Sequence, residues 1–242
     1  MNYFVYISVF ASVIISGCSV LFLKISNPTL KLILSFSGAY LFGISVLHLI
    51  PEIYSTGDHN IGVYILIGFL LQILMEFFSE GIEHGHMHIH DHAGKAFPST
   101  MMIALSIHSF LEGMPLENLN VQHAADGFNR NSLLVGIIMH NIPIAIALMT
   151  MLLQSHISKN ASLFWLCIFA LMTPFGTFTA HVLGTNMIAD MSLYSNKIMA
   201  VVIGIFLHIS TTILFESSEN HRLNFLKFFI ILLGAAAAMI QL

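Results

Sequence analysis

Charged residues are scarce in this 242-residue chain. Lys, Arg, Asp and Glu make up only 8% of it, and 57% of the residues are hydrophobic. In soluble domains about a quarter of the residues are charged. One soluble core of this size could not bury so much apolar surface. The composition therefore predicts an integral membrane protein.

Cysteine and clustered positive charge are scarce as well. Cys18 and Cys167 lie far apart in apolar stretches, which excludes a disulfide framework and a CxxC metal site. The net charge of −4 is spread along the chain without a basic patch, so no nucleic acid is expected as a partner. The nucleotide-binding pattern GxxxxGK(S/T) is absent, so ATP hydrolysis is not expected to drive the protein.

What the chain does have is a series of long hydrophobic stretches. They run to about 20 residues, the length of a helix that crosses a bilayer, and they lack the ten-residue alternation of barrel strands. We therefore expect an all-α, polytopic membrane protein, with residues 1–242 forming a single transmembrane domain of eight helices in one bundle. The segments are 3–23, 30–50, 61–79, 100–117, 132–154, 161–184, 198–216 and 223–242.

The basic residues predict the orientation of these helices. Most of them lie in or beside odd-numbered connections, and by the positive-inside rule these connections face the cytoplasm. Both termini are then outside, and the loop at about 80–99 is cytoplasmic. The odd-numbered connections hold Lys24, Lys31, Lys95, Lys159, Arg222 and Lys227, and the even-numbered ones hold Arg130 and Lys197.

Polar residues interrupt two of the hydrophobic segments. His108 and Glu112, in SIHSFLEG, lie one helical turn apart and so share a helix face, and His140 and Asn141 follow in IIMHNIPIAIAL. A carboxylate at the centre of a membrane helix costs about 2.5–3.5 kcal/mol on insertion scales, so something must compensate it. A hydrogen bond between helices is one candidate. A divalent cation is the other, because imidazole and carboxylate are zinc ligands.

We favour the cation, and predict a site made by His108, Glu112 and His140. Three protein ligands leave a fourth position for water, or for Asn141 or Ser109. A replaceable fourth ligand suits an ion that must leave again. Binding requires deprotonated ligands, so it should weaken as the pH falls toward the usual imidazole pKa of about 6.5.

The chain resembles the ZIP (Zrt-, Irt-like protein) family of divalent-metal transporters over essentially its whole length. HSFLEG resembles the first metal motif of the family, HNIPIA the start of the second, and HLIPE the end of its second helix. The resemblance implies uptake of zinc or iron into the cytoplasm through a site on the fourth and fifth helices. It also implies a homodimer and an elevator-like motion, in which the first, fourth, fifth and sixth helices slide against the others.

One position departs from the family pattern. Many members have glutamate in the second motif, HNxPEG, where this chain has Ile144 followed by Ala145. Isoleucine cannot coordinate a metal, so the carboxylate that would bridge two ions is missing. We therefore expect one bound metal in the transport site.

Histidines recur in the loop between the third and fourth segments, in EHGHMHIHDH, as is usual in the family. Such a tract can bind metal weakly by folding around it, as a sink or sensor near the inner mouth, or it can be a solvated tract with no defined role. The histidines are His84, His86, His88, His90 and His92.

Four further polar residues could line the pathway. His48 and Glu52, at the outer end of the second segment, are candidates for an entrance ligand or for a polar cap at the membrane interface. Glu76 and Glu80, at the inner end of the third segment, are candidates for exit ligands or for a solvated helix end.

Two other protein classes also place histidines inside apolar helices. A haem protein would use two of His108, His140, His181 and His208 as axial ligands, but it would not explain Glu112 beside His108. An intramembrane zinc protease needs a motif such as HExxH, which is absent.

We thus expect no enzymatic activity and no prosthetic group. The expected cargo is Zn²⁺, with Fe²⁺, Cd²⁺, Co²⁺ and Mn²⁺ as alternatives that the same ligands accept. The expected location is the lipid bilayer of a bacterial inner (cytoplasmic) membrane.

Overall fold

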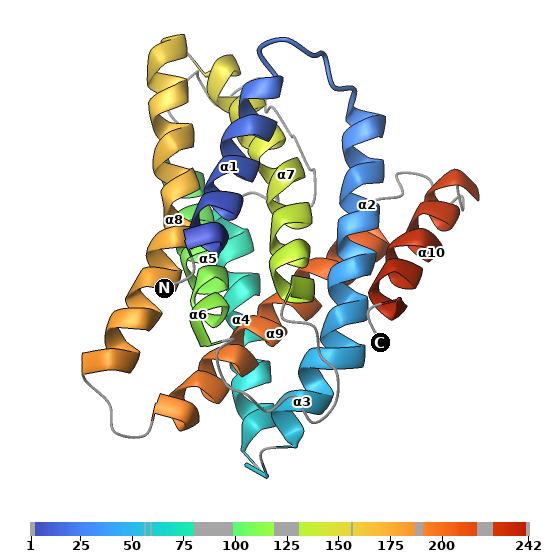
Figure 1. The fold of residues 1–242 in the computed structure, drawn as a ribbon. Helices are drawn as coiled ribbons and strands as arrows, with labels where there is room; N and C mark the ends of the chain where they lie inside the picture. Colours follow the sequence, from blue (N-terminus) through green and yellow to red (C-terminus); the bar gives the residue numbers. More distant parts are fainter. Residues whose placement is uncertain are drawn as a thin grey trace.

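The computed structural model describes residues 3–55, 57–58, 60–79, 99–118, 131–155, 157–186, 191–216 and 225–240. Every regular element in these ranges is helical, as predicted (Figure 1). The elements are α1 (Tyr3–Ser19), α2 (Asn27–Ile44), the π-helix η1 (Ser45–Leu49), α3 (Ile50–Tyr54), α4 (Ile61–Ser79), α5 (Ser99–Gly113), α6 (Pro115–Asn118), α7 (Asn131–Gln154), α8 (Lys159–Asn186), α9 (Met191–Glu216) and α10 (Phe225–Met239).

Five of the described helical stretches are long and apolar enough to cross a membrane. They are Asn27–Tyr54, Ile61–Phe78, Asn131–Gln154, Lys159–Gly184 and Tyr194–Phe215. α1 and α10 are shorter apolar helices. Large apolar side chains on the outer faces of α4 and α10 are exposed, among them Leu70, Phe77 and Phe228. Such apolar faces fit the hydrocarbon core of a bilayer, whereas their exposure to water would be unfavourable.

Proline alters two of the predicted segments. α2 passes through η1 into α3 just before Pro51, which has no N–H and whose ring crowds the carbonyl four residues earlier. A π-helical turn is one way for a helix to accommodate such a break. The predicted segment 100–117 also divides, because α5 ends at Gly113 and Pro115 begins α6.

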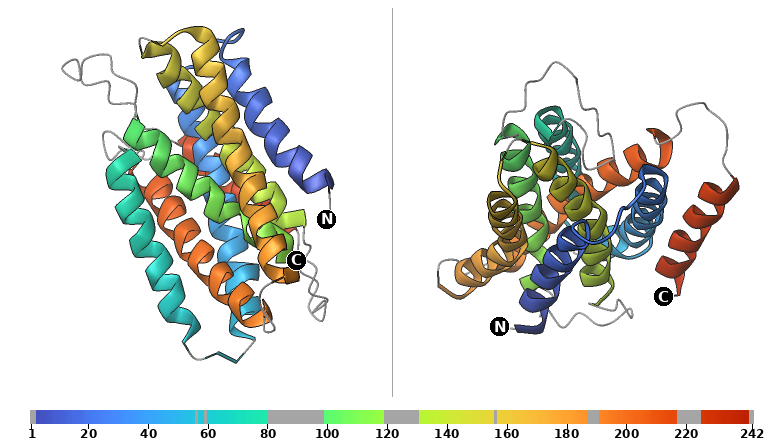
Figure 2. Two further views of the ribbon diagram at one scale, coloured as in Figure 1. Left: turned by 90° about the vertical axis from the view of Figure 1, so that its left-hand side faces the viewer. Right: turned by 90° about the horizontal axis from the view of Figure 1, so that it is seen from above.

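The helices pack as two groups. The first helix group consists of α1, α5, α7 and α8, with extensive contacts between α1 and α7, α5 and α8, and α1 and α8. The second helix group consists of α2, α4, α9 and α10, held by contacts between α4 and α9, α2 and α10, and α2 and α9. Seen from above, α8 and α10 lie on opposite sides of the molecule (Figure 2). The groups meet mainly where α2 contacts α7 and α4 contacts α5.

Glycine brings helix backbones into direct contact within each group. In the first helix group, a Cβ on Gly113 would overlap the carbonyl of Thr173, and one on Gly176 would overlap that of Phe110. In the second helix group, the same holds for Gly68 against Val201, Gly204 against Ile65, and Gly234 against Phe36. Such small-residue contacts hold membrane helices closely together.

At the boundary between the two groups, the glycine of α7 faces side chains and not a helix backbone. The three atoms nearest to a Cβ on Gly136 of α7 would be side-chain atoms of α2, from Ile44, Leu41 and Tyr40. Side chains can repack, whereas interlocked backbones cannot pass one another. The Tyr40 hydroxyl also donates a hydrogen bond across this boundary to the carbonyl of Ser132, at 3.1 Å.

Candidate metal site

The predicted ligands of α5 lie together in the protein interior. His108 and Glu112 are four residues apart, and the helix places His108 Nε2 3.0 Å from Glu112 Oε1. Both side chains have no exposed surface. A carboxylate with no access to water is costly unless positive charge or hydrogen-bond donors lie beside it. One imidazole alone gives limited compensation.

α7 adds the second imidazole. The rings of His108 and His140 have centroids 5.9 Å apart and planes at 81°. One ligand atom from each of His108, Glu112 and His140 lies within 4.8 Å of the other two. Within the described residues, this is the one group of three or more such side chains that could hold a metal ion. Two nitrogens and a carboxylate oxygen are a donor set that zinc accepts, with a fourth position left for water.

The two additional candidates, Ser109 and Asn141, adjoin these ligands in the sequence. Both side chains are fully buried. Among the described residues, neither the Ser109 hydroxyl nor either atom of the Asn141 amide has a hydrogen-bond partner. Buried polar atoms of this kind usually have a partner, so they indicate a place for water or an ion.

Ile144 lies one helical turn beyond His140 on α7. Its side chain is fully buried, in an apolar cluster with Leu105 and Leu148. The position where the family pattern has a carboxylate is therefore part of the apolar core here.

The structure also reveals what fixes α5 against α8 beside the ligands. The Thr177 hydroxyl donates hydrogen bonds to the carbonyl of Gly113, at 2.8 Å, and to that of Thr173, at 3.1 Å. Gly113 directly follows Glu112, so the two helices are joined one residue from the carboxylate. Thr177 was not predicted from the sequence, because residue spacing within one helix gives no information about a neighbouring helix.

His48 and Glu52 are not brought to this site. His48 is buried, and its Nε2 lies 3.2 Å from the carbonyl oxygen of Ala238 on α10. Glu52 is exposed on α3. The pair belongs to the second helix group.

Glu76 is paired with His208, one of the histidines considered above as a haem ligand. Its Oε2 lies 3.4 Å from His208 Nε2 on α9, and the His208 ring packs edge-on against Phe69. This pair joins α4 to α9. Glu80 and the five loop histidines His84, His86, His88, His90 and His92 lie outside the described residues.

His181 has a carboxylate partner as well. Its Nδ1 lies 2.6 Å from Oε1 of Glu117 on α6. Glu117 was missed, since it follows the break at Pro115 and nothing local links it to α8. With His181 and His208 each beside a glutamate, and His108 and His140 sharing Glu112, the arrangement does not favour the bis-histidine haem hypothesis.

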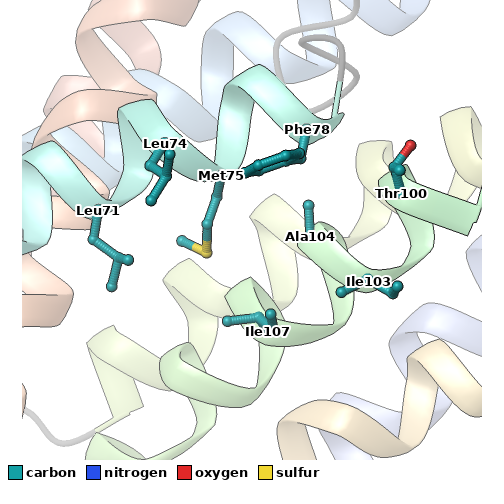
Figure 3. A pocket seen from close by; sticks show the side chains of 8 residues that line it. All are labelled: Leu71, Leu74, Met75, Phe78, Thr100, Ile103, Ala104 and Ile107. Carbon is teal, nitrogen blue, oxygen red and sulfur yellow. The ribbon is translucent and has the colours of Figure 1, made fainter.

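A separate pocket of about 380 Å³ lies between α4 and α5, at the boundary of the two groups (Figure 3). Its walls are apolar apart from Thr100, so it offers no ligands to a cation. The lining residues are Leu71, Leu74, Met75, Phe78, Thr100, Ile103, Ala104 and Ile107.

Comparison with known families agrees with the motifs. The family model described as ZIP Zinc transporter matches residues 83–241, which include the three clustered side chains His108, Glu112 and His140. Among curated proteins, none matches the chain significantly.

Proposed function

Because the chain belongs to the ZIP family of zinc transporters, a family of integral membrane proteins that move divalent metals, we propose that it imports zinc into the cytoplasm through His108, Glu112 and His140. One observation carries this proposal. Three ligand atoms from two helices lie within 4.8 Å of one another at a point that water does not reach. A carboxylate is costly there when the site is empty, and a divalent cation offsets that cost.

The site is proposed to hold one zinc ion. The two imidazoles bind as neutral ligands and Glu112 as a carboxylate, with water, Ser109 or Asn141 in the fourth position. The apolar burial of Ile144 supports a single ion, because an aliphatic side chain fills the position where the family pattern has the bridging carboxylate. A single carboxylate also leaves a bound divalent ion with residual positive charge. That charge favours release once water can enter.

The metal preference follows from the ligand types. Nitrogen and carboxylate donors suit zinc, and they also accept Fe²⁺, Cd²⁺, Co²⁺ and Mn²⁺. We therefore propose zinc as the main cargo and these ions as competitors.

The two-group packing supports alternating access by sliding. All three proposed ligands lie in the first helix group, which corresponds to the first, fourth, fifth and sixth predicted spans. Backbone contacts at Gly113 and Gly176 keep α5 and α8 together as a unit. At the boundary, Gly136 meets side chains, and these can repack as the first helix group moves. The hydrogen bond from Tyr40 to Ser132 would break in that motion.

The membrane arrangement is part of the same proposal. Eight spans of residues 1–242 form one domain, with both termini outside and the histidine-rich loop at about 80–99 in the cytoplasm, where it holds released metal. The protein acts as a homodimer in a cytoplasmic membrane.

Uptake by purified protein in proteoliposomes tests the proposal. We expect zinc accumulation that Cd²⁺ and Co²⁺ inhibit, and its loss in His108→Ala and Glu112→Ala. Asp58→Asn is a matched control, because Asp58 is a carboxylate in the α3–α4 connection, away from the proposed site. Its Oδ1 accepts a hydrogen bond from the backbone N–H of Asn60, at 2.9 Å, and the Oδ1 of asparagine can accept the same bond. Equal uptake by the parent and both alanine variants would refute the proposed site.

A further inference from the structure

The pair formed by Glu117 and His181 has the same chemistry as His108 and Glu112 in the deep site, which consists of His108, Glu112 and His140. The pair is more accessible to water than the deep site. Glu117 Oε1 and His181 Nδ1 are 2.6 Å apart. The side chains are 13% and 28% exposed, whereas His108 and Glu112 have no exposed surface. A carboxylate and an imidazole that water can reach are thus held side by side.

The pair lies on α6 and α8, which both contact α5, the helix of His108 and Glu112. Glu117 is on α6, which follows α5 after the break at Pro115. His181 lies one helical turn beyond Thr177, whose hydroxyl bonds to the carbonyl of Gly113 next to Glu112. Going from Glu112 toward the ends of α5 and α8 therefore leads to Glu117 and His181. In the proposed orientation this is the outer side.

A hydroxyl on α1 interacts electrostatically with Glu117. The hydroxyl of Tyr6 on α1 is buried and has no hydrogen-bond partner within the part of the chain that the structure describes. It lies within electrostatic range of Glu117. α1, α6 and α8 thus each contribute one polar side chain to this region.

We propose that Glu117 and His181 form an outer capture site for divalent cations, which holds an incoming metal before it reaches His108, Glu112 and His140. This inference rests on the proposed function. A cation between Oε1 and Nδ1 replaces the hydrogen bond of the pair, and water completes its shell because both groups are partly exposed. Two protein ligands bind more weakly than three, so a captured ion can move on. α6 has its most extensive contacts with α8, a member of the first helix group, so capture and deep binding stay aligned when that group moves.

A purely structural role makes a different prediction. If the pair only joins α6 to α8, its loss should loosen the end of α5 and lower the maximal transport rate, leaving the metal dependence unchanged. If it captures metal, its loss should raise KM for metal and leave the maximal rate nearly unchanged. Glu117→Gln and His181→Gln separate the two roles, because glutamine can keep a hydrogen bond but is a poor metal ligand.

Zinc uptake in proteoliposomes, measured over a range of zinc concentrations, is the first test. We expect Glu117→Gln and His181→Gln each to raise KM about tenfold, as changes around metal sites commonly do. Asp58→Asn, a carboxylate removed outside the pair, should leave KM unchanged and so controls for general electrostatic attraction. An unchanged KM in both glutamine variants, or a lower maximal rate at the parental KM, would overturn the proposal.

Cobalt binding to detergent-purified protein is the second test, and it distinguishes this inference from the proposed function. The protein for this test lacks residues 84–92, so that the histidine-rich loop cannot bind cobalt. In its Glu112→Ala variant the deep site is disabled, and we expect a weak Co²⁺ absorption band to remain. Adding His181→Gln should remove that band. If the band persists in the double variant, the capture site is refuted even where the deep site is correct. If the deep site is wrong, Glu112→Ala will transport normally, and the effect of the glutamine variants on KM is still measurable.

Discussion

Gly113 lies in backbone contact with Thr173, one residue from the carboxylate of Glu112. A Cβ on Gly113 would overlap the Thr173 carbonyl, and the nearby Thr177 hydroxyl binds the Gly113 carbonyl at 2.8 Å. α5 therefore cannot carry any larger residue here without moving away from α8. The position of the proposed ligands depends on this close approach.

Gly113→Ala should impair transport strongly. The added methyl group must push two backbones apart, and overpacking of this kind costs about 1–3 kcal/mol. We expect weaker zinc binding and lower thermal stability of the purified protein, measured by calorimetry and by unfolding in detergent. Gly62→Ala is the control, because a Cβ on Gly62 meets only the hydroxyl of Tyr54, the end of a side chain that can rotate. Equal binding by the two variants would show that the α5–α8 contact does not position the ligands.

Thr177→Val should have a smaller effect of the same kind. It removes the hydroxyl that bonds to Gly113 but keeps the side-chain volume, so we expect a stability loss of about 0.5–1.5 kcal/mol and a modest loss of zinc affinity. Thr179→Val is the matched control on the same helix, since the Thr179 hydroxyl bonds only within α8, to the carbonyl of Phe175. A zinc affinity that falls equally in both variants would exclude a positioning role for Thr177.

The sequence was sufficient to predict much of the fold, because crossing a bilayer imposes a length and a composition that can be read locally. The predicted segments 61–79 and 132–154 nearly coincide with α4 and α7. The spacing of His108 and Glu112 also lies within one helix turn, so their proximity followed from helix geometry. That His140 joins them was predicted from ligand chemistry and from the family motifs.

Contacts between distant helices could not be predicted in this way. Glu117 and His181 are 64 residues apart, and nothing in either local pattern specifies the other. The pairing of Glu76 with His208 depends in the same way on how α4 packs against α9. The division of the segment 100–117 was not predicted for a different reason: the apolar residues continue across the break before Pro115, so hydropathy alone does not show it.

Ile144→Glu should allow the site to bind a second metal ion. The variant supplies the carboxylate of the HNxPEG pattern one turn from His140, at a position that is now fully buried. We expect bound zinc, measured by elemental analysis of protein lacking residues 84–92, to rise from one to two per protomer. Without metal the variant should be less stable, because a second buried carboxylate is uncompensated. Ile144→Gln is polar and similar in size but should stay at one; two ions already present in the parent would contradict the single-metal proposal.

Ala104→Trp should stop transport without preventing metal binding. Ala104 is 4% exposed and faces the pocket between α4 and α5, at the boundary between the helix groups (Figure 3). An indole there fills the pocket and wedges α5 against Leu71 and Met75, so the first helix group can no longer slide. The proposed ligands are unchanged, so zinc affinity in detergent should stay within about threefold of the parent, a difference below 1 kcal/mol, while uptake in proteoliposomes falls to the background level.

Leu66→Trp is the control for Ala104→Trp. Leu66 lies on the exposed face of α4 outside the pocket, so this variant should transport normally. Normal uptake by Ala104→Trp would mean that metal passes without relative motion at this boundary, as it would through a channel.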